Sequence, residues 1–127
     1  MNKLIITLFL IVPLVGLSQS SEELKFDELF TQLDTMPTYV DGEEALLQFF
    51  NENSSMKFIK KKKYGSLVSI NFIVSKEGKV YEPKVLVSTT KEKGEEVKRL
   101  ILLTHWEPGI RKGKKVNVSH NLVVNVE

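Results

Sequence analysis

The sequence predicts an α+β fold in which a three-stranded antiparallel sheet is packed by two helices. Apolar and polar residues alternate along 67–88, around a central Gly, and again along 116–126 at the C-terminus. Two other segments, 41–50 and 95–104, repeat apolar residues every three or four positions. Alternation indicates a half-buried strand, and the longer repeat indicates a half-buried helix. The chain therefore supplies three strands and two helices for one layered core.

Composition limits the class of protein. The 127 residues are 42% hydrophobic, which suits one domain. The formal net charge is +2, and removal of a leader that carries only Lys3 would leave 17 basic against 16 acidic residues. A charge balance this small does not indicate a nucleic-acid partner. The chain has no Cys, so disulfides, thiolate catalysis and Cys-ligated zinc are excluded.

Residues 1–18 have the pattern of a cleaved signal peptide. Lys3 gives a positive start, an apolar stretch of 14 residues follows from Leu4 to Leu17, and small residues precede a cleavage site after Ser18, with Ser20 as the second choice. The stretch is shorter than the roughly 20 apolar residues that a spanning helix needs. We therefore expect an exported protein with no stable membrane span after signal cleavage.

After the signal, the sequence predicts an N-terminal extension over 19–35 and a folded domain over 36–127. Apolar residues between Leu24 and Leu33 fit either a short helix or an extended segment. Pro37 makes Met36 non-helical. The first helix is expected to start at Asp41 as its N-cap, to place Leu46, Phe49 and Phe50 in the core, and to end within 51–55.

Four consecutive lysines, 60–63, follow the first helix. Such a run suits either a contact for phosphate, anionic lipid or an acidic partner, or a solvated loop between helix and sheet. The hairpin comes next, with strands over 67–75 and 80–88 and with Gly78 in its turn. Pro83 removes a hydrogen-bond donor from the second strand, which predicts an edge position or a bulge there.

A polar link over 89–94 is expected before the second helix, 95–104. Val97, Leu100, Ile101 and Thr104 share one face of that helix, and Leu102 and Leu103 widen its apolar stripe, which predicts a deeply packed end. Pro108-Gly109 ends the helical part and turns the chain, and Trp106 is expected to pack against the sheet. A basic turn over 111–115 then leads to the last strand.

The last strand, 116–126, is predicted to have one buried face and to be the outermost strand of the sheet. Its apolar face holds Val116, Val118, Leu122, Val124 and Val126. Its polar face holds Asn117, Ser119, Asn121 and Asn125. The backbone groups of an outermost strand are free to pair with another chain.

Several motifs in this order resemble those of the C-terminal domain of TonB, in the form that is common among Bacteroidota. The resemblance covers roughly residues 26–127. It rests on these segments: Met36-Pro37-Thr38-Tyr39, Gly42 to Phe50, Val68 to Val87 around Gly78, Trp106-Glu107-Pro108-Gly109, Arg111 to Val118, and Val123 to Val126. Where the family has Gly-Gly before the first helix, this chain has Asp41-Gly42.

The resemblance implies a periplasmic interaction module linked to TonB-dependent transport. Domains of this family accept an extended peptide of an outer-membrane receptor as an extra strand at a sheet edge. It implies that Asn117, Ser119, Asn121, Val123 and Asn125 form the peptide-binding edge, and that Trp106, Pro108 and Gly109 are structural. The sequence has no counterpart of the TonB membrane anchor or Pro-rich spacer, so we do not expect it to harvest the proton-motive force by itself.

Two other interpretations remain at this point. The edge could be solvated or paired with a second copy of the chain, as in a structural or regulatory envelope protein that dimerises without receptor peptides. The chain could also be an enzyme or an anion-binding protein that uses the lysine run and His105. No spacing of His105 or His120 with other residues indicates a metal or catalytic site, and no Gly-rich phosphate loop follows a strand. We therefore expect neither an enzyme nor a cofactor.

Overall fold

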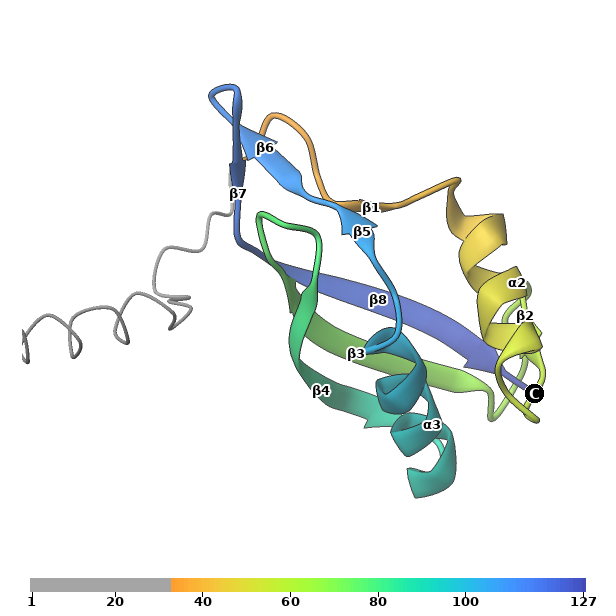
Figure 1. The fold of residues 1–127 in the computed structure, drawn as a ribbon. Coiled ribbons are helices and arrows are strands. Elements are labelled where there is room, and N and C mark those ends of the chain that lie inside the picture. The colour runs from red at the N-terminus through yellow and green to blue at the C-terminus, as the bar shows by residue number, and fades with distance from the viewer. Residues whose placement is uncertain (1–32) are drawn as a thin grey trace, which may run out of the picture.

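The computed structural model describes residues 33–127, which form an α+β fold built around a four-stranded antiparallel sheet (Figure 1). The predicted signal peptide and residues 19–32 of the predicted extension lie outside the described residues, as does all but the end of the segment between Leu24 and Leu33. The strand order is β2-β8-β3-β4. These strands span Phe58–Ile59, Val118–Val126, Leu67–Val74 and Val80–Ser88.

The central hairpin matches its prediction closely. β3 and β4 pair around a turn in which Gly78 has a φ of +85°, the left-handed region that favours glycine. β4 is an edge strand, and its register shifts twice against β3. One shift contains Glu82 and Pro83. The edge position and the bulge that Pro83 predicted for this strand are therefore both confirmed.

The sheet has one strand more than predicted, because β2 pairs with the C-terminal end of β8. Phe58 lies opposite Val126, and Ile59 lies opposite Asn125. The prediction that the last strand is outermost is therefore wrong at its C-terminal end. It is right from Ser119 to Val123, where β3 is the only described strand that pairs with β8. Two residues are too few to show alternation, which is why the sequence pattern missed β2.

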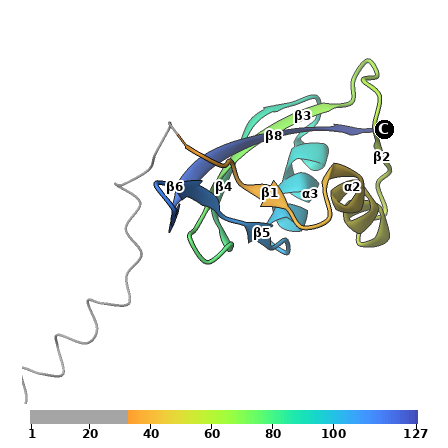
Figure 2. The ribbon, with the colours of Figure 1, turned by 90° about the horizontal axis from the view of Figure 1, so that it is seen from above.

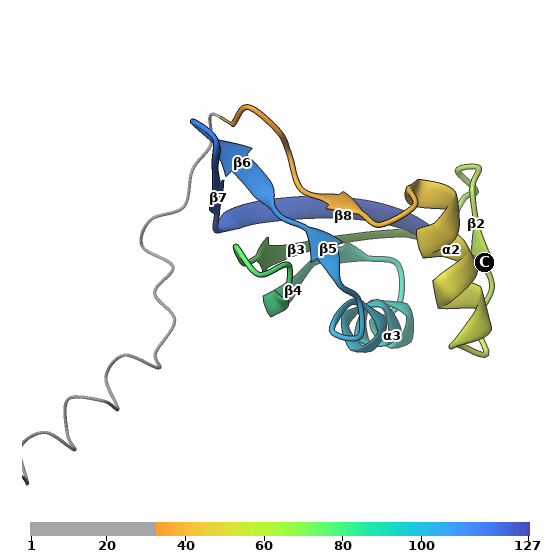
Figure 3. The same ribbon diagram turned by 45° about the horizontal axis from the view of Figure 1, so that its top comes forward.

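The predicted last strand is also split in two. β7, Lys114–Val116, pairs with β6, Gly109–Arg111, in a small hairpin whose turn is Lys112-Gly113. β8 then begins at Val118, and Figure 3 shows it running from this hairpin to the C-terminus beside α2. The predicted alternation along β8 is confirmed, since Val118, Val124 and Val126 are buried.

The first helix, α2, spans Glu43–Glu52 and buries Leu46 and Phe50, as predicted. Its N-cap is Gly42, with no capping side chain, rather than the predicted Asp41. Asp41 has a φ of +71°, so the backbone turns before the helix instead of presenting a capping carboxylate.

The second helix, α3, spans Lys91–Ile101, so the predicted polar link is mostly its first turn. Thr90 caps it by accepting a hydrogen bond from the Lys93 amide at 3.2 Å. A Cβ on Gly94 would lie 3.1 Å from Ser88 and Val85 side chains, so glycine lets α3 pack closely on β4. Because the helix ends at Ile101, Leu102 and Leu103 leave its apolar stripe and are 51% and 56% exposed, against prediction.

Both helices lie on one face of the sheet, together with a small ribbon of β1, Thr38–Tyr39, and β5, Trp106–Glu107 (Figure 2). The core lies between the helices and the helix-facing residues of the sheet. Its fully buried members include Phe50, Val68, Ile70, Phe72, Val97, Leu100, Ile101 and Val126. The opposite face of the sheet carries more polar residues, and no described helix covers it (Figure 2).

Polar contacts fix α2 against its neighbours. The Asn51 side chain accepts a hydrogen bond from the Phe58 amide at 2.7 Å and donates one to the Phe58 carbonyl at 3.1 Å. At the end of α2, Ser54 donates to Glu96 of α3, and Arg99 donates to the Asn53 carbonyl. A hydrogen bond from Arg99 lowers the pKa of Glu96 to about 2. These contacts hold α2 beside the C-terminal end of β8.

Candidate functional site

The backbone N–H and C=O groups of successive residues in β8 point to alternate sides of the strand. The Val126 amide donates to the Ser66 carbonyl on the β3 side, at 2.8 Å, whereas the Glu127 amide donates to the Lys57 carbonyl on the β2 side, also at 2.8 Å. The register of β8 with β3 is continuous from Asn125 to Val118. Even-numbered residues of β8 therefore pair with β3, and odd-numbered residues direct their N–H and C=O groups to the other side.

Three of the five predicted edge residues lie where that other side has no described strand beside it. β2 reaches only as far as Asn125, so Ser119, Asn121 and Val123 direct their backbone groups to a side of β8 that no described strand occupies. We call the stretch from Ser119 to Val123 the open edge. Its register is regular, without a bulge.

The other two predicted residues have structural contacts instead. Asn117 lies between β7 and β8, and its side-chain oxygen accepts a hydrogen bond from the Lys76 amide at 2.9 Å. Asn125 lies opposite Ile59, and its side-chain oxygen accepts a hydrogen bond from Ser66 Oγ at 2.9 Å. The candidate edge is therefore shorter than the sequence predicted.

The two remaining edges of the sheet are protected. The outward backbone groups of Phe58 in β2 are taken by the Asn51 side chain. The outer strand β4 is interrupted by two register shifts and by Pro83, which has no N–H to donate. Among the described residues, the open edge is thus the stretch of sheet best suited to accept another strand.

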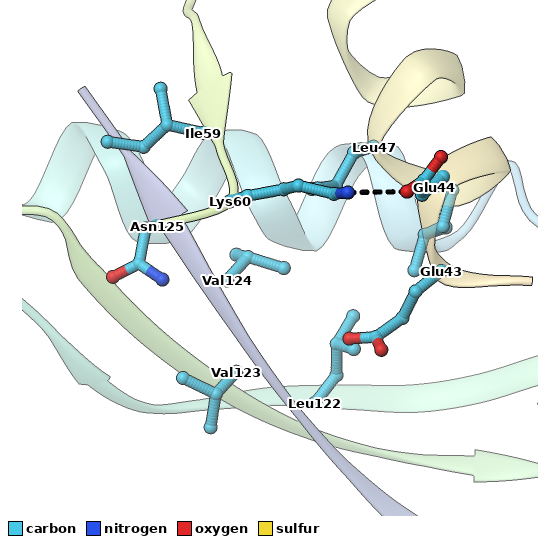
Figure 4. Close-up of a pocket in the computed structure, with 10 residues that line it drawn as sticks. Glu43, Glu44, Leu47, Ile59, Lys60, Leu122, Val123, Val124 and Asn125 are labelled. Carbon is cyan, nitrogen blue, oxygen red and sulfur yellow. Dashed lines mark hydrogen bonds and ion pairs between the residues drawn. The ribbon is translucent and has the colours of Figure 1, made fainter. Parts of the chain in front are cut away.

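A groove runs beside the open edge. It consists of two adjoining cavities of about 360 and 490 Å³, which share Glu43 and Leu46 of α2 and Leu122 and Val123 of β8. We call it the edge groove. Ile59 and Lys60 line one end, and Pro37, Tyr39 and Trp106 line the other. Figure 4 shows the β2 end, with α2 and β8 facing each other across it.

Sequence reasoning missed the helical wall of this groove. The apolar repeat assigns Leu46 only to the core, and no sequence pattern assigns Glu43 to a binding site. Leu46 is 2% exposed, so that interpretation holds for its packing. No local pattern indicates that α2 would face the edge of β8, because the placement depends on the pairing of β2 with β8, which are distant in sequence.

Trp106 forms the base of the aromatic end, as predicted for a residue packed on the sheet. It is 3% exposed, and its ring centroid lies 5.6 Å from Tyr39, 5.3 Å from Phe72 and 5.4 Å from His120. Its indole N–H donates to Thr104 at 2.8 Å. The indole is therefore a structural support for the groove, consistent with its predicted role.

Pro108 and Gly109 follow Trp106 where the chain passes close to β8. The expected turn at Pro108-Gly109 is wrong, because α3 already ends at Ile101 and Gly109 begins β6 without a positive φ. A Cβ there would lie 2.7 Å from the Val118 side chain. Glycine is required at this position because β6 and β8 approach each other closely.

His120 is the titratable group beneath the edge groove. Its ring packs edge-on against Phe72 and Trp106, and its Nδ1 atom is buried without a hydrogen-bond partner among the described residues. Burial lowers the pKa of His120 below its usual value of about 6.5. The folded domain therefore favours the neutral imidazole.

We expect stability to fall between pH 7.5 and pH 5.5 because of His120. As the pH drops through about 6.5, the unfolded chain takes up the proton first, so the stabilisation is complete above this pH and decreases below it. Urea unfolding at both pH values should show this decrease in the native chain and a smaller one in His120→Leu. An identical pH dependence in the two proteins would contradict the assignment.

The lysine run is partly used within the fold. Lys60 pairs with Glu44, and Lys63 pairs with Glu127 at 2.6 Å. Lysine hydrogen bonds lower the pKa of Glu44 and of Glu127. The side chains of these two pairs are 39% to 77% exposed, so each pair contributes little to stability. These contacts fit the interpretation of the lysine run as a solvated loop between the helix and the sheet.

Comparison with known proteins gives no relative. No family model matches the chain, and neither a curated protein nor a solved structure matches it. Within residues 33–127, no helix has the length and apolar character needed to cross a membrane. In the same range, no three His, Asp or Glu side chains are grouped so that they could hold a metal ion. The fold and the edge groove are therefore the basis for a functional assignment.

Proposed function

We propose that this chain is a periplasmic, non-enzymatic interaction domain of the TonB C-terminal type. It binds an extended segment of an outer-membrane receptor, or of another envelope partner, as a strand added to the open edge. In this role it would take part in TonB-dependent transport, with the energy supplied by another component. The signal-like N-terminus and the ordered motifs support the location and the class.

One observation carries the proposal. Within residues 33–127, a regular stretch of β8 is unpaired on one side and borders a groove, while the other edges of the sheet are blocked by Asn51 and by the bulge at Pro83. A protein normally protects its sheet edges, because exposed backbone groups pair with other chains. An open stretch beside a groove is the arrangement that strand addition uses, with main-chain bonds for affinity and side-chain pockets for selectivity.

Asn121→Pro is expected to abolish partner binding while the domain stays folded. The Asn121 N–H points to the open edge, so proline removes a donor for the guest strand but no backbone bond to β3. It also removes an exposed side-chain bond, the one that Asn71 of β3 donates to Asn121 Oδ1 at 2.7 Å. The measurement is a pull-down of periplasm-facing segments of outer-membrane receptors, with circular dichroism to monitor folding.

Asn121→Thr is the matched control, because it keeps the N–H and suits a strand. It should bind like the native chain. Equal capture by the native chain and Asn121→Pro would contradict strand addition at this edge, and so would failure of the native chain to capture any receptor segment.

The same edge favours one other function, that of an envelope protein that dimerises. Two copies could pair their open edges antiparallel around a two-fold axis, and each would then hide the backbone groups of the other. Size measurement under dilution separates the two functions. A dimer that persists at nanomolar concentration and is lost in Asn121→Pro would favour dimerisation over receptor binding.

A further inference from the structure

Two neighbouring carboxylates at the start of α2 have different environments in the edge groove. Glu44 is paired with Lys60, and Figure 4 marks this contact with a dashed line. Glu43 lines both cavities of the groove, but its carboxylate has no hydrogen bond or ion pair with any residue in 33–127. In Figure 4 its side chain extends from α2 toward the β8 side of the groove.

The edge groove is locally negative although the chain is basic overall. The charged residues that line it are Glu43, Glu44 and Lys60, and His120 is neutral in the folded domain. Because Lys60 balances Glu44, the charge of Glu43 remains. The formal net charge of the chain is +2, so this negative spot does not simply reflect composition.

A guest strand on the open edge would place every second side chain over the groove. Side chains alternate between the two faces of a sheet, and those on the helix-facing side would lie beside Leu122 and Leu46. The next side chain on the same face of the guest strand is two residues away, and it would also lie in the groove. Apolar lining with one unpaired carboxylate suits an apolar side chain and a cation at this spacing.

We propose that Glu43 selects the partner strand. The strand carries Lys or Arg two residues from a large apolar side chain, with both on the groove-facing side and the cation paired with Glu43. Main-chain pairing at the open edge tolerates many sequences, so the carboxylate would supply discrimination. This inference rests on the proposed function, because it requires that a strand is added at Ser119–Val123.

The test is selection from a displayed library of random octapeptides. The baits are the native chain, Glu43→Gln, which removes the charge with little change of shape, and Glu43→Lys, which reverses it. Glu52→Lys is the matched control. It makes the same charge change on the same helix, at an exposed residue that lines neither cavity. Circular dichroism checks that each variant is folded.

The native chain and Glu52→Lys should enrich Lys or Arg two positions from Val, Ile, Leu or Phe. Glu43→Gln should lose the preference for the cation, and Glu43→Lys should replace it with Asp or Glu. Selected peptides resynthesised with Gln for the cation should bind the native chain about fivefold more weakly, as expected for one partly exposed ion pair.

The possible failures can be told apart. If all four baits select the same strand-forming peptides, the role of Glu43 is overturned and strand addition remains. If none of the baits selects peptides whose binding is lost in Asn121→Pro, the proposed function is overturned together with this inference.

Discussion

Trp106→Ala is expected to destabilise the domain by about 3–5 kcal/mol, the usual cost of removing a large buried aromatic side chain. The indole is 3% exposed and contacts the rings of Tyr39, Phe72 and His120. It therefore joins the β1–β5 ribbon to the sheet. Domains are typically stable by about 5–15 kcal/mol, so the variant would be close to unfolding.

Urea unfolding followed by circular dichroism measures this loss. Fluorescence is unsuitable, because Trp106 is the only Trp of the chain. Leu103→Ala is the matched control for a large apolar side chain, since Leu103 is 56% exposed, and it should cost less than about 0.5 kcal/mol. A loss below about 1 kcal/mol in Trp106→Ala would contradict the packing described for this residue.

Gly78→Ala is expected to cost about 2–5 kcal/mol, from two sources that add. The φ of +85° strains any residue with a Cβ. In addition, the Cβ would lie 2.2 Å from the Trp106 carbonyl oxygen, a backbone atom that cannot move independently. The Trp106 amide donates to the Gly78 carbonyl at 2.9 Å, so the turn would have to separate from β5.

Gly113→Ala isolates the first of these sources. Gly113 has a φ of +77°, and nothing lies within 4 Å of a Cβ at that position. The variant should lose only about 1–2 kcal/mol, from the left-handed backbone alone. Thermal and urea unfolding of both variants give the comparison, and equal losses would show that the contact between the turn and β5 contributes nothing.

The parts of the fold that the sequence predicted are those with a local pattern. The alternation along β3, β4 and β8 is set by burial of one face, and Gly78 marks the turn between the first two. The parts that it missed depend on contacts made outside the segment itself. β2 exists because Asn51 and the end of β8 hold two residues extended, and a pattern of two residues carries no period.

The start of α3 was missed for a related reason. Lys91 to Gly94 is polar and ends in a glycine, which on its own favours a link. In the structure, Thr90 caps the helix, and Gly94 permits close packing on β4. Tertiary contact thus outweighs the low helix propensity of glycine.

The candidate site was predicted in part. The polar face of the last strand indicated Ser119 and Asn121, and both lie on the open edge, with Val123 between them and β2. Asn117 and Asn125 have the same polar pattern but bind Lys76 and Ser66. A side-chain pattern cannot distinguish these cases, because strand pairing is a property of the backbone. The groove and Glu43 became evident only from the position of α2.

Residue-resolved hydrogen exchange tests the central claim most directly. In the free monomer, the amides of His120 and Leu122 should exchange slowly, because they pair with β3, whereas those of Ser119, Asn121 and Val123 should exchange fast. Saturation with a periplasm-facing receptor segment should slow these three amides. The account is contradicted if they are already slow in the free monomer, or if they remain fast in the saturated complex.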